Sequence, residues 1–389
     1  MISCGEPSGD LYAGALTREI RSIDSASDVF GFGGEHLASA GARLVGDYRG
    51  LSVTGLVEVV RLLPKTYAMY RRLVAEARAR RPDVFVAIDF PDFNFRLAGA
   101  LRRLGIPVVY YISPQLWAWR PGRLRTMARL VDRVLVIFPF EEEIYRRAGV
   151  PVAFVGHPLV ELLQPAGPRE AFLRGLALAP GAPTVALLPG SRRNEVSLIL
   201  PTLVEAAGTL AREVRDVQFV LARAPHLDDG LFAPFDTARR AGLRGAVIEA
   251  STDAVLAAAD VVVTASGTAT VQTALHERPM VIVYRLSPLT YRLGIRFVKV
   301  DTYGMVNLVA GRRVATELIQ NGFTADAVAR EVLRYLGDAA AAASARADMR
   351  EVKARLGGAG ASRRAAEHVL AVARRGTPAA IAPRVPVVE

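Results

Sequence analysis

Residues 84–95 read VFVAIDFPDFNF. Val84 to Ile88 form a continuous apolar run between two prolines, Pro82 and Pro91. Such a run is typical of a strand in a parallel sheet, because helices cover both faces of these sheets. The run ends in Asp89, and burial of a carboxylate is unfavourable unless a partner pairs with it. The stretch therefore predicts a buried strand, and Asp89 is either a turn residue or a reacting group at its end.

Further apolar runs of strand length alternate with amphipathic stretches along the chain. The runs cover residues 108–113, 133–138, 184–188, 217–222, 246–249, 261–265 and 281–284. The helical patterns include residues 97–104, 195–214 and 269–276. Strand and helix in alternation are typical of parallel sheets with covered faces. We therefore predict an α/β fold with two doubly wound, Rossmann-like halves.

A break in composition divides the chain at residues 156–172, GHPLVELLQPAGPREAF, which supply the proline and glycine of a linker. We expect one Rossmann-like domain over residues 1–160 and a second over residues 161–340. Residues 341–375 are rich in Ala and Arg and predict helices. The composition of residues 376–389 is typical of a disordered tail.

The bulk composition excludes several classes of protein. With 51% apolar and 22% charged residues among 389, the chain predicts globular domains with large cores. One cysteine excludes an internal disulfide and fits a reducing cytoplasm, and the spacing of the five histidines predicts no metal site. No apolar run reaches the ~18–20 residues of a membrane span. The net charge of +11 comes almost entirely from arginine, since only three of the 49 basic residues are lysines, and genome composition explains this bias better than a ligand does. The sequence has no nucleic-acid stacking motif, so we expect no nucleic acid, and anionic lipid or phosphate partners fit the charge better.

The segment GEPSGD, residues 5–10, has the composition of a turn between a strand and a helix. Its glycines permit a ligand to approach the backbone closely, and Ser8 or Asp10 suits the N-cap of the next helix. A simple strand-to-helix turn explains the segment equally well. Residues 31–34, GFGG, fail as a dinucleotide fingerprint because His36 takes the place of the third glycine.

The segment LLPGSRRNEV, residues 187–196, places Arg192 and Arg193 in the first turn of a helix. The helix dipole disfavours cations at this end, and an anion between the arginines would remove the conflict. Two exposed arginines are the alternative interpretation. A turn that binds diphosphate is favoured, since arginine pairs well with phosphate.

The segment VVVTASGTATVQTAL, residues 261–275, again follows an apolar strand with small and polar residues. Ser266, Gly267 and Thr268 open a helix, where free backbone N–H groups and hydroxyls suit phosphate oxygens. Gln272, one turn later, is near enough to bond a ribose. Two such turns in one half of the chain predict a crevice for a nucleotide diphosphate.

Two segments have both a core interpretation and a ligand interpretation. Trp117 and Trp119, the only tryptophans, lie in YYISPQLWAWRPGR, residues 110–123. They pack in the core or form a wall for a sugar ring or an acyl-bearing ligand. Residues 51–74 are apolar with interleaved Arg and Lys, and predict either a buried helix pair or a lipid-facing interfacial helix.

In order along the chain, GEPSGD, IDFPDFN, SPQLWAWRPGR, GHPLVE, LLPGSR, ASGTAT, NLVAGR and ELIQ resemble the pattern of the bacterial lipid-A-disaccharide synthases. The resemblance runs from Gly5 to about Val372. It implies the GT-B architecture, in which two Rossmann-like domains face each other across a cleft. It also implies an inverting glycosyltransferase without metal or other cofactor. The substrates implied are UDP-2,3-diacylglucosamine and 2,3-diacylglucosamine 1-phosphate, which give the β-1,6-linked lipid A disaccharide 1-phosphate and UDP.

The same resemblance implies a cytoplasmic protein that is peripherally associated with the inner membrane. Helices over residues 341–375 would pack back on the N-terminal domain or on a partner chain, which leaves a homodimer open. By position, Asp89 is the candidate general base and Arg192 the arginine at the diphosphate. The donor-binding residues implied are Gly190, Ser191, Arg192, Ser266, Gly267, Thr268, Gln272 and Asn307. The acceptor-binding residues implied are Gly5, Glu6, Ser8, Gly9, Ser113, Trp117 and Trp119.

The chain departs from the family pattern in three places. Gln272 stands where relatives often carry a ribose-binding glutamate, so weaker contacts are expected there. Val306 and Thr316 replace prolines, which affects the rigidity of two loops. Two rival functions remain: a UDP-N-acetylglucosamine 2-epimerase-like isomerase and an inactive UDP-sugar or lipid-binding relative. After Asp89, we expect Asp92 and Asn94 to shape the turn and cap the next helix.

Overall fold

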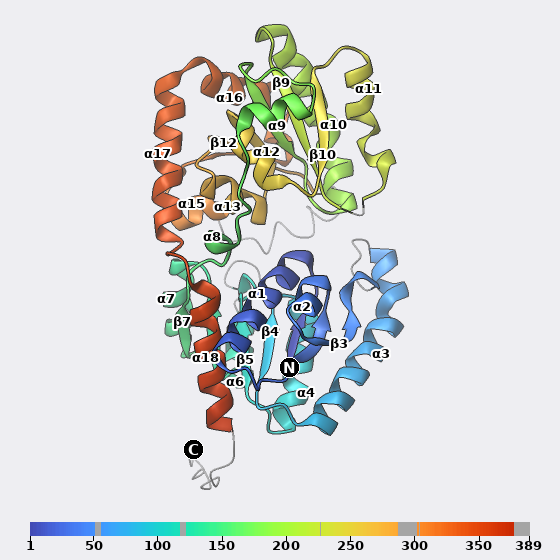
Figure 1. The fold of residues 1–389 in the computed structure, drawn as a ribbon, viewed down its shortest axis with the longest axis vertical. Coiled ribbons are helices and arrows are strands. Elements are labelled where there is room, and N and C mark those ends of the chain that lie inside the picture. Colours follow the sequence, from blue (N-terminus) through green and yellow to red (C-terminus); the bar gives the residue numbers. More distant parts are fainter. Residues whose placement is uncertain (51–55, 117–121, 226, 287–301, 303, 377–389) are drawn as a thin grey trace. The chain divides into compact units, whose positions relative to one another are not determined.

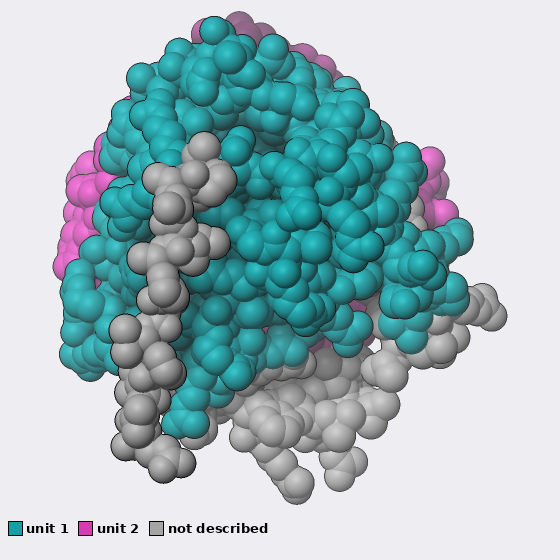
Figure 2. Space-filling view, turned by 90° about the horizontal axis from the view of Figure 1, so that it is seen from below, with its two compact units in different colours: residues 1–158, 360–389 teal, residues 159–359 magenta. Residues whose placement is uncertain are grey.

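The computed structural model describes residues 1–50, 56–116, 122–225, 227–286, 302 and 304–376 (Figure 1). The chain forms two compact units, coloured separately in Figure 2. Unit 1 comprises residues 1–158 together with the chain from Gly360 onward, and unit 2 comprises Leu159–Ala359. The boundary at residue 158 lies inside the segment rich in proline and glycine that was expected to contain the linker.

Unit 1 contains a seven-stranded parallel sheet in the order β3-β2-β1-β4-β5-β6-β7. Its strands are β1 (Ile2–Cys4), β2 (Phe30–Gly33), β3 (Arg43–Asp47), β4 (Phe85–Ile88), β5 (Val108–Tyr111), β6 (Arg133–Val136) and β7 (Val152–Phe154). Its helices are α1 (Pro7–Ile23), α2 (Glu35–Ser39), η1 (Tyr48–Gly50), α3 (Leu56–Arg80), α4 (Pro91–Arg103), α6 (Arg123–Leu130), α7 (Pro139–Arg147) and α18 (Ala361–Gly376).

Unit 2 contains a six-stranded parallel sheet in the order β10-β9-β8-β11-β12-β13. Its strands are β8 (Thr184–Leu188), β9 (Gln218–Arg223), β10 (Gly245–Glu249), β11 (Val261–Ala265), β12 (Met280–Tyr284) and β13 (Thr316–Ile319). Its helices are α8 (Leu159–Leu162), α9 (Arg169–Gly175), α10 (Arg193–Glu213), η2 (Asp229–Phe232), α11 (Ala233–Arg240), α12 (Thr252–Ala258), α13 (Thr268–Leu275), α15 (Met305–Ala310), η4 (Gln320–Gly322), α16 (Ala325–Gly337) and α17 (Ala339–Arg355).

Both sheets begin with the same strand order: third, second, first, fourth, fifth, sixth. The order reverses once in each sheet, between β1 and β4 in unit 1 and between β8 and β11 in unit 2. In sheets of this topology, ligands bind at the carboxyl edge where the strand order reverses, because the loops after the two strands leave in opposite directions. The fold thus provides one such switch point in each unit.

The apolar runs of the sequence form the centres of the two cores. All residues of β4, β5, β8 and β11 are buried, as a sheet covered on both faces requires. Phe32, Phe85 and Tyr110 belong to the core of unit 1, and Phe219 and Phe235 to that of unit 2. The prediction of two parallel α/β sheets is confirmed.

Four strands, β2, β3, β7 and β13, were not predicted from the sequence. Each has at most five residues, and their sequences FGFG, RLVGD, VAF and TELI lack a long apolar run. In β2, a Cβ added to Gly31 would lie 1.8 Å from the carbonyl oxygen of Ile2. Glycine therefore lets β2 pair closely with β1, although glycine weakens a strand on propensity alone.

The Ala- and Arg-rich segment near the C-terminus divides between the units. Helix α17 packs on α13, α15 and α16 within unit 2, whereas we expected it on the N-terminal domain or a partner. Helix α18 packs along α1 in unit 1 (Figure 1), and Arg364 Nε donates to the Val155 carbonyl oxygen at 2.9 Å. Of residues 376–389, expected to be a disordered tail, Gly376 ends α18 and residues 377–389 lie outside the described residues.

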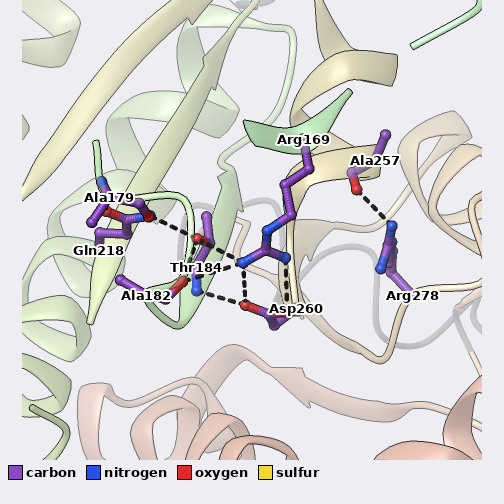
Figure 3. A network of polar contacts seen from close by, with 8 residues as sticks. All are labelled: Arg169, Ala179, Ala182, Thr184, Gln218, Ala257, Asp260 and Arg278. Atoms are coloured by element: carbon purple, nitrogen blue, oxygen red, sulfur yellow. Dashed lines mark hydrogen bonds and ion pairs between the residues drawn. The ribbon is translucent and has the colours of Figure 1, made fainter. Parts of the chain in front are cut away.

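A polar cluster joins the amino ends of three strands in unit 2 (Figure 3). Arg169 donates from two nitrogens to the two carboxylate oxygens of Asp260, each at 2.9 Å. Asp260 also accepts from the Thr184 backbone N–H at 2.8 Å, and Gln218 Nε2 donates to Thr184 Oγ1 at 2.9 Å. Thr184 and Gln218 begin β8 and β9, and Asp260 directly precedes β11. The cluster therefore lies at the amino edge of the sheet, opposite its switch point.

Candidate functional site

The two switch points bring together most of the segments that the sequence patterns predicted to be functional. In unit 1, β1 leads into GEPSGD and β4 leads into Asp89 and Phe90. In unit 2, β8 leads into residues 190–192 and β11 leads into residues 266–268. Ligands of doubly wound sheets bind at such points. Each unit therefore carries its own candidate ligand-binding position.

The turn after β4 holds two consecutive non-glycine residues in the left-handed region. Asp89 has φ +44° and Phe90 has φ +49°. Such conformations cost about 1–3 kcal/mol each and persist only where surrounding contacts enforce them. They are found preferentially at active sites, so the strain itself marks Asp89 as a candidate functional group.

Asn94 and Tyr110 hold this turn in place. Asn94 is fully buried, and its Nδ2 donates to the carbonyl oxygens of Asp89 at 2.8 Å and of Ile88 and Ser3 at 3.2 Å. The Tyr110 hydroxyl donates to the Asp89 carbonyl oxygen at 2.8 Å. Burial, and next the charge of Asp89, raises the pKa of Tyr110 well above its usual value, so the phenol keeps the proton that it donates.

The expected capping roles of Asp92 and Asn94 are corrected by this geometry. Helix α4 starts at Pro91 behind an N-cap residue, Phe90, that is left-handed. Asn94 turns inward to the strand ends instead of capping the helix, and its Oδ1 accepts from Ser3 Oγ at 2.7 Å. Asp92 is exposed and pairs with Arg123 at 2.7 Å. Sequence alone could not show this, because Ser3 lies 91 residues away from Asn94.

The GEPSGD turn packs directly against the Asp89 turn. A Cβ added to Gly5 would lie 2.3 Å from Cγ of Phe90, so only glycine fits here. Glu6 and Ser8 are half-buried at the start of α1, and Gly9 is buried close to the Cys4 side chain. Of the acceptor-binding residues predicted in this turn, the two glycines serve close packing, and Glu6 and Ser8 remain partly accessible.

Asp10 does not cap the helix in which it lies, contrary to our expectation for Ser8 or Asp10. It is buried in the first turn of α1, and its carboxylate accepts from the backbone N–H groups of Gly34, His36 and Leu37 at 2.7, 2.9 and 3.2 Å. It thereby caps α2, which begins at Glu35. The GFGG segment is thus most of β2 and the N-cap of α2, held by the Asp10 carboxylate of α1.

Ser113 follows β5 and is buried, with its hydroxyl bonded to the Tyr145 hydroxyl. Trp117 and Trp119 lie outside the described residues. His157, in the GHPLVE segment, is buried against the rings of Tyr12 and Phe138, at centroid distances of 6.1 and 5.3 Å. Burial lowers the pKa of His157 to about 3, so this imidazole is neutral at physiological pH.

In unit 2, a carboxylate of the chain itself lies beside Arg192. Gly190 has φ +119°, and a Cβ there would lie 2.6 Å from Glu195 Oε2. Glu195 Oε2 accepts from the backbone N–H groups of Ser191 and Arg192 at 3.1 and 3.3 Å. Arg192 Nη1 lies 3.4 Å from Glu195 Oε1. The carboxylate thus folds over the turn that the sequence predicts as a diphosphate site, where the N-terminus of α10 favours negative charge.

The second turn of unit 2 exposes the start of α13. Ser266 extends the strand pairing through its N–H, which donates to the Val283 carbonyl oxygen at 3.1 Å. Gly267, the N-cap of α13, has φ +148°, and both Gly267 and Thr268 are exposed. The turn therefore presents the amino end of α13 at the surface, as a phosphate-binding turn requires.

Gln272 lies one turn further along α13 and belongs to a polar cluster that was not predicted from the sequence. Its Nε2 donates to Asp253 Oδ1 at 2.7 Å, and His276 Nε2 lies 2.8 Å from the same oxygen. The backbone N–H of Gln164 donates to Asp253 Oδ2 at 2.9 Å. Burial alone would raise the pKa of Asp253, but these hydrogen bonds and the imidazole together lower it below its usual value. Asp253 is therefore ionised at neutral pH.

Asn307 is almost fully buried, and its side chain holds the chain that leads into β13. Its Oδ1 accepts from the N–H groups of Val314 and Ala315 at 2.7 and 2.9 Å. Its Nδ2 donates to the Ala315 carbonyl oxygen and to Glu317 Oε1 at 2.9 and 2.7 Å. These bonds use the two donors and two acceptor positions of the amide. The Asn307 side chain thus holds the loop between α15 and β13.

Within the described residues, no group of three or more His, Cys, Asp or Glu side chains lies close enough to hold a metal ion. None of the described helices is both long and apolar enough to cross a membrane.

Solved structures show the same architecture. The UDP-GlcNAc 2-epimerase of Neisseria meningitidis, bound to UDP-GlcNAc, is similar with a TM-score of 0.68 at 12% identity, over 95% of this chain and 98% of that chain. The glycosyltransferase of kitacinnamycin is similar with a TM-score of 0.63 at 21% identity, over 97% and 98% of the two chains. Two Rossmann-like sheets, each with its polar turns at the switch point, define a protein of the GT-B class.

Sequence relatives narrow this class to one family. The family model of lipid-A-disaccharide synthetase matches residues 1–372. The lipid-A-disaccharide synthase of Geobacter sulfurreducens is 44% identical over 373 residues, which cover 95% of this chain and 96% of that protein. The chain belongs to the lipid-A-disaccharide synthase family, whose members are glycosyltransferases of lipid A biosynthesis. The family resemblance seen in the sequence is confirmed. Membership of this family excludes the 2-epimerase alternative.

Proposed function

We propose that the protein transfers 2,3-diacylglucosamine from UDP to the 6-hydroxyl of 2,3-diacylglucosamine 1-phosphate, with inversion at the anomeric carbon. The observation that carries the proposal is the strained Asp89 turn at the switch point of unit 1. A carboxylate whose backbone is fixed by Asn94 and Tyr110 is pre-organised for one geometry. That is what a general base needs to meet a single hydroxyl group.

In this mechanism, the Asp89 carboxylate takes the proton of the acceptor hydroxyl while its oxygen bonds to the anomeric carbon of the donor. The bond between that carbon and the β-phosphate oxygen breaks, and UDP leaves with the electron pair. Arg192 and the amino ends of α10 and α13 stabilise the negative charge on the diphosphate. Gln272 accepts hydrogen bonds from the ribose, and Asn307 holds the neighbouring loop.

The decisive test supplies UDP-2,3-diacylglucosamine and 2,3-diacylglucosamine 1-phosphate and detects the disaccharide 1-phosphate by mass spectrometry. We expect product with the wild type and a loss of roughly 10²–10⁴-fold in turnover with Asp89→Ala, since this is the range that general base catalysis contributes. Asp92→Asn, which removes a nearby exposed carboxylate, is the matched control and should retain activity. Turnover by Asp89→Ala near the wild-type rate would remove Asp89 from the role of base.

We further propose that the protein acts in the cytoplasm, attached peripherally to the inner membrane through α3. Leu63 and Tyr67 are 53% and 62% exposed on this helix, with Lys65, Arg71 and Arg72 exposed beside them. Apolar side chains next to cations suit an anionic lipid surface. Co-sedimentation with vesicles that contain phosphatidylglycerol should fall in the Leu63→Ser, Tyr67→Ser variant. A homodimer stays a prediction, for which light scattering coupled to gel filtration is the measurement.

A further inference from the structure

The cluster around Asp253 fixes which way the Gln272 amide points. Asp253 is ionised and can only accept hydrogen bonds. At 2.7 Å from Asp253 Oδ1, the group of Gln272 that faces it must therefore be the donor, Nε2. The amide carbonyl oxygen, Oε1, is then turned away from Asp253. Without the carboxylate, either orientation of the amide would be available to Gln272.

The position of Asp253 makes this constraint strong. Its side chain is only 11% exposed, and its second oxygen is held by the Gln164 backbone N–H. His276, the C-cap residue of α13 and one turn after Gln272, bonds to the same oxygen as Gln272. The carboxylate is thus anchored from three directions, and rotation of Asp253 away from Gln272 would leave a buried charge with fewer partners.

We propose that Asp253 is a positioning residue that turns Gln272 into a hydrogen-bond acceptor for the ribose diol of the donor nucleotide. The two ribose hydroxyls can donate protons, and an outward Oε1 with two lone pairs accepts from them. A carboxylate presents an oxygen acceptor in the same way, so the amide held by Asp253 supplies what a glutamate would. This inference rests on the proposed binding of UDP at the switch point of unit 2.

The test exchanges the hydrogen-bond donor and the hydrogen-bond acceptor between positions 253 and 272. The measured quantity is the preference for UDP over 2′,3′-dideoxy-UDP, that is, the ratio of their dissociation constants. Isothermal titration calorimetry with the full chain gives the two dissociation constants for each variant. We expect the wild type to prefer UDP by roughly tenfold, because loss of the hydroxyls leaves the acceptor without its partners. Asp253→Asn can place an amide N–H₂ opposite Gln272, which turns Oε1 inward and reduces the preference to about onefold to twofold.

The double variant Asp253→Asn, Gln272→Glu restores the complementary pair with reversed polarity. The amide introduced at position 253 donates to the carboxylate introduced at position 272, whose second oxygen again faces the ribose. The preference should return toward the wild-type ratio. Asp260→Asn is the matched control, because it alters a carboxylate at the opposite edge of the same sheet (Figure 3) and should leave the ratio unchanged.

The outcomes separate the inference from the proposed function. A wild-type preference that survives Asp253→Asn, or a double variant that stays at the ratio of the single one, would overturn the positioning role of Asp253. Failure of the wild type to bind UDP at all would instead overturn the proposed donor site. A purely structural role of Asp253 would weaken both nucleotides equally and leave their ratio at the wild-type value.

Discussion

The two sheets share one strand order, but the side chains at their switch points differ in the sign of their charge. Near β1 and β4, the buried Asp10 and the strained Asp89 are acidic, and the fold supplies backbone N–H groups, an amide and a phenol around them. Near β8 and β11, Arg192 and two helix starts favour negative charge, and the Glu195 carboxylate accepts from the Arg192 backbone N–H there. The strand order therefore fixes where a ligand binds, whereas the residues after the strands decide its chemistry.

The largest expected difference is between Arg192 of unit 2, which should affect the binding of UDP, and Asp89 of unit 1, which should affect turnover and not binding. Arg192→Ala should raise the dissociation constant of UDP roughly 10- to 100-fold, since a charge-assisted contact to phosphate is worth about 1.5–3 kcal/mol. Asp89→Ala should change it less than about twofold, because a general base acts in the transition state. Titration calorimetry with UDP measures both. Arg212→Ala, in the last turn of α10, is the control, and equal effects of Arg192→Ala and Arg212→Ala would contradict the assignment of Arg192.

The next effect concerns the support of the Asp89 turn. Asn94→Ala leaves the Asp89 carbonyl with Tyr110 alone and removes the Ser3 contact. The free energy of unfolding should fall by about 2–4 kcal/mol, as buried groups lose partners. Turnover should fall roughly 10- to 100-fold as the base loses its orientation.

The dissociation constant of UDP should be unchanged in Asn94→Ala, although stability and turnover fall. Urea denaturation, turnover and calorimetry on Asn94→Ala, with the exposed Asn321→Ala as control, make the three measurements. Normal turnover in a destabilised Asn94→Ala variant would show that Asp89 does not depend on the strained turn.

A third prediction uses the neutral His157 of unit 1. Its pKa is about 3 in the folded state against 6.5 in an unfolded chain, so the unfolded state binds more protons between these values. The contribution of His157 to stability is therefore complete above pH 6.5 and is lost as the pH falls, by up to about 1.4 kcal/mol for each pH unit. Urea denaturation of the wild type between about pH 7 and pH 5 should show this slope. His157→Gln should lack it, whereas the exposed His36→Gln should keep it.

A weaker effect is expected from Glu195, whose carboxylate lies in the proposed diphosphate-binding turn of unit 2. Glu195→Gln removes one negative charge next to the diphosphate and releases Arg192 from its pair. UDP should bind about twofold to fivefold more tightly at low salt, which corresponds to the ~0.3–1 kcal/mol of a charge at a helix end. The gain should shrink in high salt. Weaker binding of UDP would show instead that Glu195 orients the turn for the nucleotide.

Local sequence patterns predicted much of the fold and located the candidate site. Continuous apolar runs identified the central strands β4, β5, β8 and β11. A strand buried on both faces is apolar throughout and shows no alternation of apolar and polar residues. The short strands β2, β3, β7 and β13 carry no such signal and were missed. Asp89 and Arg192 became candidates because each closely follows a buried strand, where a charged side chain is unfavourable unless it has a partner or a function.

The amino-acid sequence alone predicted the α/β class, the two sheets and the family. It also predicted that Asp89, Arg192 and Gln272 lie just after strands or in the helix that follows. How these groups are held became visible in the tertiary structure. Asn94 meets Ser3, Tyr110 meets Asp89, and Asp253 meets Gln272 across separations of 19 to 91 residues along the chain. Such contacts form when the strands pair and α12 and α13 pack on the second sheet. Periodicity and propensity report only on neighbours along the chain, so they could not reveal these partners.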